Sequence, residues 1–332
     1  MGDVEAMSTN NTIEAPPEQS GATRGPGVGQ RMFGRVLRAL PKPLVRLAAS
    51  PYIAGERLEE ALEIADSLWK QRSILSTLDV LGEDVATQAD IDAFETEFEH
   101  LIDALATRPY ANISLKLSAL GQLQSEEACY ERAEKLVVRA RSVNSFVRLD
   151  MEDHTTIDST LRVYRALRER HDNCGIVLQS RLFRTQADFE KLASLQPNVR
   201  LCIGIYPEPA VVALTDKVAM KRQMLVLLEQ MWENGQHVAI ATHEEWVIRE
   251  ALEIAAQRGK PDEELEVQML LGVPRAEIQS ELIDRGIRIR LYVPYGRQWH
   301  PYSLRRLEHN PDMMKMVAGN VLRGIFRPGS RG

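Results

Sequence analysis

Residues that could bind a small anion are concentrated near the C-terminal end of this 332-residue chain. Residues 290–296, RLYVPYG, are typical of a strand, and Arg290 and Tyr292 share one side of it because side chains alternate along a strand. Arg305 and Arg306 follow on a predicted helix, where two planar guanidinium groups can hold a carboxylate. An arginine pair is also common on a solvated helix face, so its meaning depends on the rest of the chain.

Polar side chains also interrupt other apolar segments that are typical of strands. A buried, unpaired charge there would cost several kcal/mol, so these side chains must be paired or lie near the end of a strand. They are Lys116, Arg148, Asp150, Gln179, Arg200, Thr242, His243, Gln268 and Tyr292, most of them toward the C-terminal strand ends. Two interpretations stay open for Lys116, Arg148 and Asp150: a reaction site, or a buried ion network that only fixes strand register.

Eight short apolar segments alternate with longer charged segments of helical spacing. The predicted strands are residues 73–80, 112–117, 146–151, 175–179, 199–206, 237–242, 264–270 and 287–293. This alternation predicts an α/β fold, a (βα)8 TIM-type barrel with an N-terminal helical extension, and such barrels place their reaction sites at the C-terminal strand ends. No strand is followed by a G-x-G-x-x-G turn, so a Rossmann nucleotide site is not supported.

Composition divides the chain into four regions. Residues 1–30 are rich in Gly, Pro and polar residues and predict a disordered tail. Residues 31–56 form a basic, amphipathic helical arm, which either packs on the main domain or contacts a membrane surface. Residues 57–327 form the barrel, and 328–332 a short tail.

Charge and cysteine usage exclude several classes of protein. A net charge of -6 with no dominant basic stripe argues against a nucleic-acid partner. Three cysteines without metal-ligand spacing fit a reducing, cytoplasmic setting, and the His, Cys, Asp and Glu pattern predicts no metal. No segment is long and apolar enough for a membrane span.

In order and spacing, the motifs resemble those of the monofunctional bacterial proline dehydrogenases through most of residues 52–327. The matching segments are YIAGERLEEAL, ISLKLSALG, VRLDMED, IVLQSRLFRT, RLCIGIYPEP, ATHEE, VQMLLGV and RLYVPYGRQWHPYSLRRLEHNP. The resemblance implies a (βα)8 barrel that binds FAD, oxidises L-proline to Δ1-pyrroline-5-carboxylate, and passes electrons to a quinone. It also implies a cytoplasmic protein, with peripheral contact at the inner membrane as an open alternative.

The same resemblance assigns roles to individual residues. It makes Lys116, Arg305 and Arg306 the clamp for the substrate carboxylate. It places Asp150, Tyr292 and Leu270 around the substrate ring. On the cofactor side it assigns Gln179, Arg200, Thr242 and His243 to FAD. The chain departs from the family pattern at Ile203, where a lysine is usual, and at His309, where a glutamate is usual.

Three alternatives to proline oxidation stay open at this point. A flavin barrel could act on a different cyclic imino acid. Lys116 could serve as a Schiff-base amine in a lyase, because burial can lower a lysine pKa. The barrel could also have lost its reaction and serve only in binding.

Overall fold

The computed structural model describes residues 42–82 and 85–309, and within them eight parallel strands close into a barrel. Each strand pairs with the next along the chain, and β8 closes the barrel against β1, with Thr77 opposite Tyr292. The strands are β1 (Leu75–Val80), β2 (Ala111–Leu115), β3 (Val147–Leu149), β4 (Cys174–Gln179), β5 (Asn198–Cys202), β6 (His237–Ala241), β7 (Glu266–Leu270) and β8 (Arg288–Tyr295). The predicted (βα)8 barrel is confirmed.

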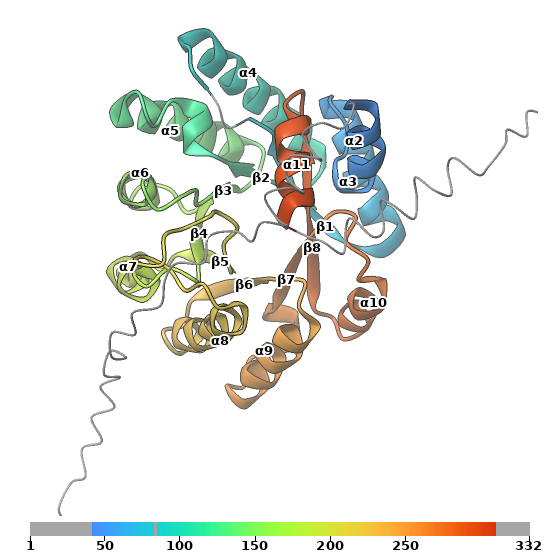
Figure 1. Ribbon diagram of the computed structural model, residues 1–332, viewed down its shortest axis with the longest axis vertical. Helices are drawn as coiled ribbons and strands as arrows, with labels where there is room; N and C mark the ends of the chain where they lie inside the picture. Colours follow the sequence, from blue (N-terminus) through green and yellow to red (C-terminus); the bar gives the residue numbers. More distant parts are fainter. Residues whose placement is uncertain (1–41, 83–84, 310–332) are drawn as a thin grey trace, which may run out of the picture.

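Helices surround this barrel in a ring (Figure 1). They are α3 (Leu58–Arg72), α4 (Gln88–Ala104), α5 (Glu126–Ser142), α6 (Ile157–Arg168), α7 (Thr185–Leu192), α8 (Lys217–Glu233), α9 (Glu245–Gln257) and α10 (Ala276–Asp284). Short 3-10 turns occur at Ser50–Tyr52, Leu105–Thr107, Leu117–Leu120, Ala193–Leu195 and Asp262–Glu264. Two further helices, α2 (Lys42–Ala49) and α11 (Trp299–His309), pack against each other outside the ring.

The strands have two chemically different faces. On the outer face, aliphatic residues such as Leu78, Ile113 and Leu149 are at most 1% exposed and share one core with the helices. On the inner face the alternate residues are largely polar, and they bond across the barrel: Arg148 of β3 donates to Asn198 of β5, at 2.7 Å between Nη2 and Oδ1. The period-2 alternation therefore divides an aliphatic helix-facing layer from a polar barrel interior.

Several predicted strand limits are wrong by a few residues. Residues 203–206 were expected to continue the fifth strand, but β5 ends at Cys202 and a loop follows, so Arg200 lies in the middle of the strand. Lys116 follows the last residue of β2 instead of lying within it, and Thr242 and His243 follow β6. At the eighth strand the error is reversed, because β8 continues to Tyr295, past the predicted end at Val293.

The described part of the N-terminal arm lies against the barrel and against α11. Val45 of α2 is fully buried, and the Arg46 guanidinium pairs with Glu56 at 3.1 Å. The same Glu56 carboxylate accepts a hydrogen bond from the Trp299 indole, at 3.0 Å. Of the two alternatives for this segment, packing on the main domain holds for residues 42–56. The rest of the arm and both predicted tails, residues 1–41 and 310–332, lie outside the described part.

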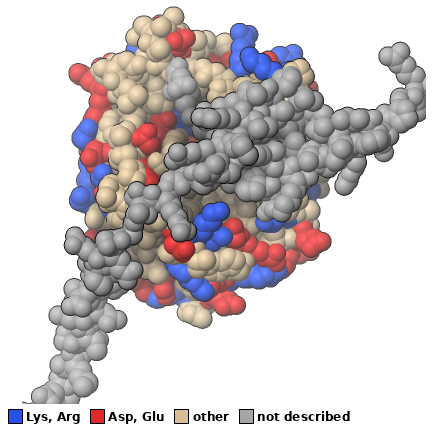
Figure 2. Space-filling view, viewed as in Figure 1, with Lys and Arg blue, Asp and Glu red and all other residues tan. Residues whose placement is uncertain are grey.

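Charged side chains of both signs are interspersed over the described surface visible in Figure 2. Among the helices that the structure describes, none has the length and hydropathy to cross a membrane.

The loop after β7 gives a test of how the N-terminal arm is fixed. Gly272 has a φ of +78°, and a Cβ there would lie 2.1 Å from the Pro51 carbonyl oxygen. Gly235 has a similar φ of +73° with nothing within 4 Å, so it is the matched control. We expect Gly235→Ala to lower the free energy of unfolding by about 1–2 kcal/mol through backbone strain. Gly272→Ala should lower it clearly further, because the arm must also move.

Urea unfolding of the two variants measures this difference. Equal losses in both variants would show that the contact between Gly272 and Pro51 contributes nothing to stability.

Candidate active site

Lys116 lies at the C-terminal mouth of the barrel, directly after β2 and before the 3-10 turn Leu117–Leu120. Its extended backbone, with φ -91° and ψ 123°, continues the strand direction, so its side chain enters the barrel. The ammonium Nζ donates to Asp79 Oδ1 at 2.6 Å and lies 3.4 Å from the Tyr292 hydroxyl. Asp150 Oδ2 lies 3.7 Å away, so three oxygen-bearing side chains surround this cation.

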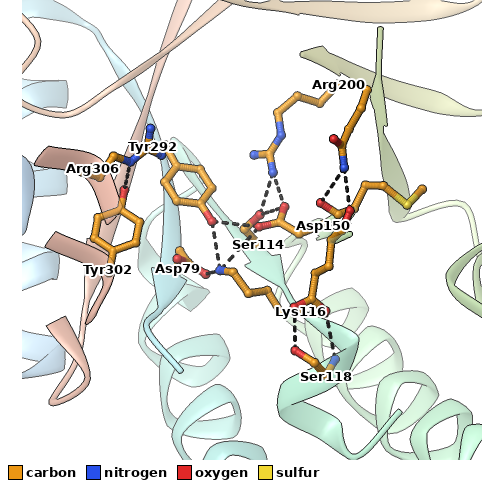
Figure 3. A network of polar contacts seen from close by, with 12 residues as sticks. Asp79, Ser114, Lys116, Ser118, Asp150, Arg200, Tyr292, Tyr302 and Arg306 are labelled. Atoms are coloured by element: carbon orange, nitrogen blue, oxygen red, sulfur yellow. Dashed lines mark hydrogen bonds and ion pairs between the residues drawn. The ribbon is translucent and has the colours of Figure 1, made fainter. Parts of the chain in front are cut away.

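Asp150 joins this cluster to the opposite side of the barrel. One carboxylate oxygen, Oδ1, accepts hydrogen bonds from the Ser114 hydroxyl and the Arg200 guanidinium. The other, Oδ2, accepts from the Tyr292 hydroxyl at 2.8 Å. Arg200 also stacks over the Tyr292 ring, 5.1 Å from its centroid. In Figure 3 these side chains point toward one another from separate strands.

The charges in this cluster stabilise each other. Burial lowers the pKa of Lys116, but the neighbouring Asp79 outweighs burial and leaves that pKa well above its usual value. Burial likewise opposes ionisation of Asp150, yet Arg200 and Lys116 hold its pKa below the ordinary range. Burial, followed by the charge of Asp150, raises the pKa of Tyr292, which therefore remains a hydrogen-bond donor. The cluster thus holds a fixed cation, a fixed anion and a neutral phenol.

Two carboxylates that the sequence interpretation missed help to position Lys116. Asp79, on the inner face of β1, is its closest partner and is fully buried. Glu152, in the loop after β3, accepts from the Ser118 hydroxyl at 2.7 Å and so fixes the turn after Lys116. Asp79 could have been found from the sequence, because it occupies an inward position near the end of an otherwise apolar strand.

A second group of polar side chains lies at the ends of β4 and β6. Gln179 ends β4, and its amide nitrogen donates to the Glu152 carbonyl at 2.7 Å. Its amide oxygen is buried and has no hydrogen-bond partner among the described residues. Thr242 follows β6, and its hydroxyl oxygen accepts from the Glu244 backbone at 3.2 Å.

His243 is held in one tautomer by the backbone of β7. Its Nε2 accepts a hydrogen bond from the Leu270 N–H at 2.9 Å, so the ring proton is on Nδ1. Burial, with the charges of Arg306 and Arg275, lowers the pKa of His243 to about 4. The imidazole is therefore a neutral Nδ1–H donor near neutral pH, and Leu270 lies beside Tyr292 in the sheet register.

The donor and acceptor set at these strand ends fits a flavin. A flavin ring offers carbonyl acceptors and one ring N–H donor, and its phosphates are acceptors. The chain presents a buried acceptor without a partner on Gln179, donors on His243 and Thr242, and the Arg200 cation between them and the Lys116 cluster.

Arg306 of α11 lies beside the Lys116 cluster without bonding to it. Its Nε donates to the Tyr302 hydroxyl at 3.0 Å, and the guanidinium lies 5.2 Å from the centre of that ring. Its charge acts on both His243 and Cys202, so it faces the same mouth of the barrel. The side chain of Arg305 lies outside the described part of the structure, as does that of His309.

The structure thus separates the predicted residues into groups. It joins Lys116, Asp150 and Tyr292 with Arg200, which was expected on the cofactor side. Arg148 belongs to another network deeper in the barrel, where it donates to the Asn198 carbonyl at 2.6 Å. Within residues 42–82 and 85–309, no three His, Cys, Asp or Glu side chains converge as metal ligands.

The departure at Ile203 lies in the loop after β5. Ile203 is partly buried against the core, and its carbonyl accepts from the Arg181 backbone N–H at 3.2 Å. The Arg181 guanidinium donates to the Tyr206 carbonyl at 2.7 Å and the Leu214 carbonyl at 3.2 Å. Arg181 therefore fastens this loop to the loop after β4.

Comparison with known proteins gives a consistent result. A family model described as proline dehydrogenase matches residues 61–205 and 211–318. A proline dehydrogenase of Deinococcus radiodurans is 34% identical over 284 residues, which cover 83% of this chain and 90% of that one. Proline dehydrogenase 1 of Bacillus subtilis is 33% identical over 283 residues, covering 85% of this chain and 92% of that one.

Solved structures agree in fold. Proline utilization A from Bdellovibrio bacteriovorus, inactivated by N-propargylglycine, superposes with a TM-score of 0.74 at 24% identity. The match covers 83% of this chain but only 34% of that protein, so this chain spans about a third of its length.

The environment of His243 predicts a pH dependence of stability. The unfolded chain has an ordinary histidine with a pKa near 6.5, whereas the folded pKa is about 4. Between these values the unfolded state binds a proton that the folded state does not, so the free energy of unfolding should decrease as the pH falls. His243→Gln should make this decrease shallower, and urea unfolding at several pH values measures it. The exposed His100, replaced by Gln, is the control, and equal slopes for both variants would count against a buried, neutral His243.

Proposed function

Because the chain belongs to the proline dehydrogenase family, we propose that it oxidises L-proline to Δ1-pyrroline-5-carboxylate with FAD bound across the ends of β4, β5 and β6. The observation that carries this proposal is the position of the Lys116 cluster directly beside the flavin-compatible group. A substrate held at the first would lie against a cofactor held at the second. Bound FAD supplies a two-electron acceptor for the hydride that leaves proline C5.

The residues of this chain would then bind and orient the substrate. Lys116 and Arg306 would pair with the proline carboxylate, with Arg305 as the third cation implied by the family pattern. Tyr292 and Leu270 would enclose the ring, and Asp150 would hold the Tyr292 hydroxyl in place. Such positioning is effective because hydride transfer requires the reacting carbon at a fixed place and angle.

Four side chains would hold the flavin. Gln179 would accept the ring N–H, the neutral His243 and Thr242 would donate to the cofactor's oxygens, and Arg200 would place a positive charge beside the reacting ring. That charge would favour the reduced cofactor, which gains electron density. The electrons would pass to a quinone, and contact with the membrane surface by residues 31–41 would bring this acceptor within reach.

The alternative Schiff-base reaction is disfavoured by one observation. A lysine that attacks a carbonyl must be a neutral amine, but Asp79, Tyr292 and Asp150 keep Lys116 protonated. Oxidation of another cyclic imino acid, and a barrel without catalysis, stay as outcomes of the following experiment.

The function is tested by the flavin spectrum. Purified protein should carry FAD, or take it up when FAD is added, and anaerobic L-proline should bleach the flavin absorbance. Bleaching by another cyclic imino acid and not by proline would change the substrate while keeping the reaction. A protein that binds no FAD at excess cofactor would refute the proposal.

The carboxylate clamp is tested with substitutions that keep the shape of the side chain. Lys116→Met and Arg306→Met should each lower kcat/KM for proline roughly 100-fold, about 2.7 kcal/mol, through loss of a charge-assisted pair. Arg249→Met is the control, because this arginine pairs with Glu245 and Glu281 on the outer helices. If Arg306→Met behaves like Arg249→Met in steady-state kinetics, Arg306 does not contact the substrate.

A further inference from the structure

The two carboxylates beside Lys116 are bound in very different ways. Both oxygens of Asp150 accept hydrogen bonds, from Ser114 and Arg200 on one side and from Tyr292 on the other. This carboxylate has a strong counter-ion besides Lys116, so it remains an anion whatever Lys116 does.

Asp79 has no such support. Its Oδ1 is bound by Lys116 at 2.6 Å, while its Oδ2 is buried and has no hydrogen-bond partner among the described residues. The side chain is fully buried, so water does not replace the missing partner. Burial raises the pKa of Asp79 to about 6, against the lowering effect of Lys116.

The ionisable groups around Asp79 come from every neighbouring strand. They are Lys116 after β2, Asp150 after β3, Arg200 of β5, and Tyr292 and Tyr295 of β8. Of these, Lys116 is the only described side chain with an ion pair to Asp79. The state of Asp79 and the availability of the Lys116 ammonium are therefore linked directly.

We propose that Asp79 is a proton-responsive positioning residue, which sets how strongly Lys116 can hold the carboxylate of a ligand. This inference rests on the proposed function, because it requires a substrate carboxylate at Lys116. When Asp79 is ionised, it competes with that carboxylate for the same ammonium. When Asp79 takes up a proton, the competition ends and Lys116 is released toward the ligand.

The sign of the effect follows from linkage. Asp79 is ionised above its pKa of about 6, so a carboxylate ligand binds more weakly there and more tightly as the pH falls. Reciprocally, a bound carboxylate places a second negative charge near Asp79 and raises its pKa. Binding near neutral pH must then be accompanied by uptake of a proton from solvent.

Cyclopentanecarboxylate is a suitable probe for this coupling. It has the five-membered ring and carboxylate of proline but no nitrogen, so it can neither be oxidised at a C–N bond nor release an amine proton. Its Kd for the FAD-saturated protein is measured by titration calorimetry between about pH 6 and pH 8.5, where a simple carboxylic acid is ionised. Repeating the titration in buffers of different ionisation enthalpy gives the number of protons taken up.

For the native protein we expect Kd to rise about tenfold from the low to the high end of this range, equivalent to a pKa change of about one unit on binding. Asp79→Asn keeps the shape of the side chain and removes its charge. This variant should bind the probe about tenfold more tightly than the native protein at the high end, with a nearly constant Kd and no proton uptake.

Two further variants separate this role from a purely structural one. Asp79→Ser removes the charge with a smaller side chain and should give the same flat profile if Asp79→Asn folds poorly. Asp188→Asn removes a buried carboxylate that pairs with Arg184 on α7, and it should keep the native pH profile.

The outcomes distinguish this inference from the proposed function. If the native protein binds the probe with a constant Kd, or if Asp79→Asn keeps the native pH dependence or binds more weakly throughout, the role of Asp79 is refuted while the function stands. If the FAD-saturated native protein binds neither the probe nor L-proline, the proposed function itself fails, and this inference with it.

Discussion

Asp150 ties strands β2, β3, β5 and β8 together across the interior of the barrel, through Ser114, its own strand, Arg200 and Tyr292. A barrel interior filled with aliphatic side chains would need no such bonds. Here the inner face is largely polar, so each buried charge needs a partner, and removing one partner would leave the other unpaired in a medium of low dielectric constant. The interactions that arrange the mouth of the barrel are therefore also those that hold its strands in register.

The interior is divided into two levels with separate networks. Deeper in the barrel, Glu266 pairs with Arg290 at 2.9 Å, and this pair, which outweighs the effect of burial, lowers the pKa of Glu266 to about 2. Arg148 has only neutral acceptors, and burial followed by the charge of Arg200 lowers its pKa to about 9. This lower level has its charges balanced internally, so the groups at the mouth are free to respond to a ligand without disturbing the base of the barrel.

The sequence was sufficient to predict the barrel, because eight apolar segments alternate with helical ones and the outer strand faces are consistently aliphatic. It also predicted that Lys116, Asp150 and Tyr292 would meet, because barrels bring C-terminal strand ends together. It could not predict that Arg200 bonds to Asp150 or that Arg306 bonds to Tyr302, because long side chains choose partners by geometry that strand spacing does not determine. The error at the end of β5 has a local cause, since the apolar residues after Cys202 pack in a loop that Arg181 fastens.

Closure of the barrel by β1 and β8 has a consequence for how the protein is made. Leu75 pairs with Arg290, near the opposite end of the chain, so β1 leaves the ribosome long before its partner. At ordinary rates of translation that delay is roughly ten to forty seconds, during which one edge of β1 has no strand beside it. Such an edge invites pairing with other chains. Asp79 and Thr77 place polar groups along this waiting edge, and a carboxylate needed later inside the barrel can earlier discourage aggregation of the unfinished chain.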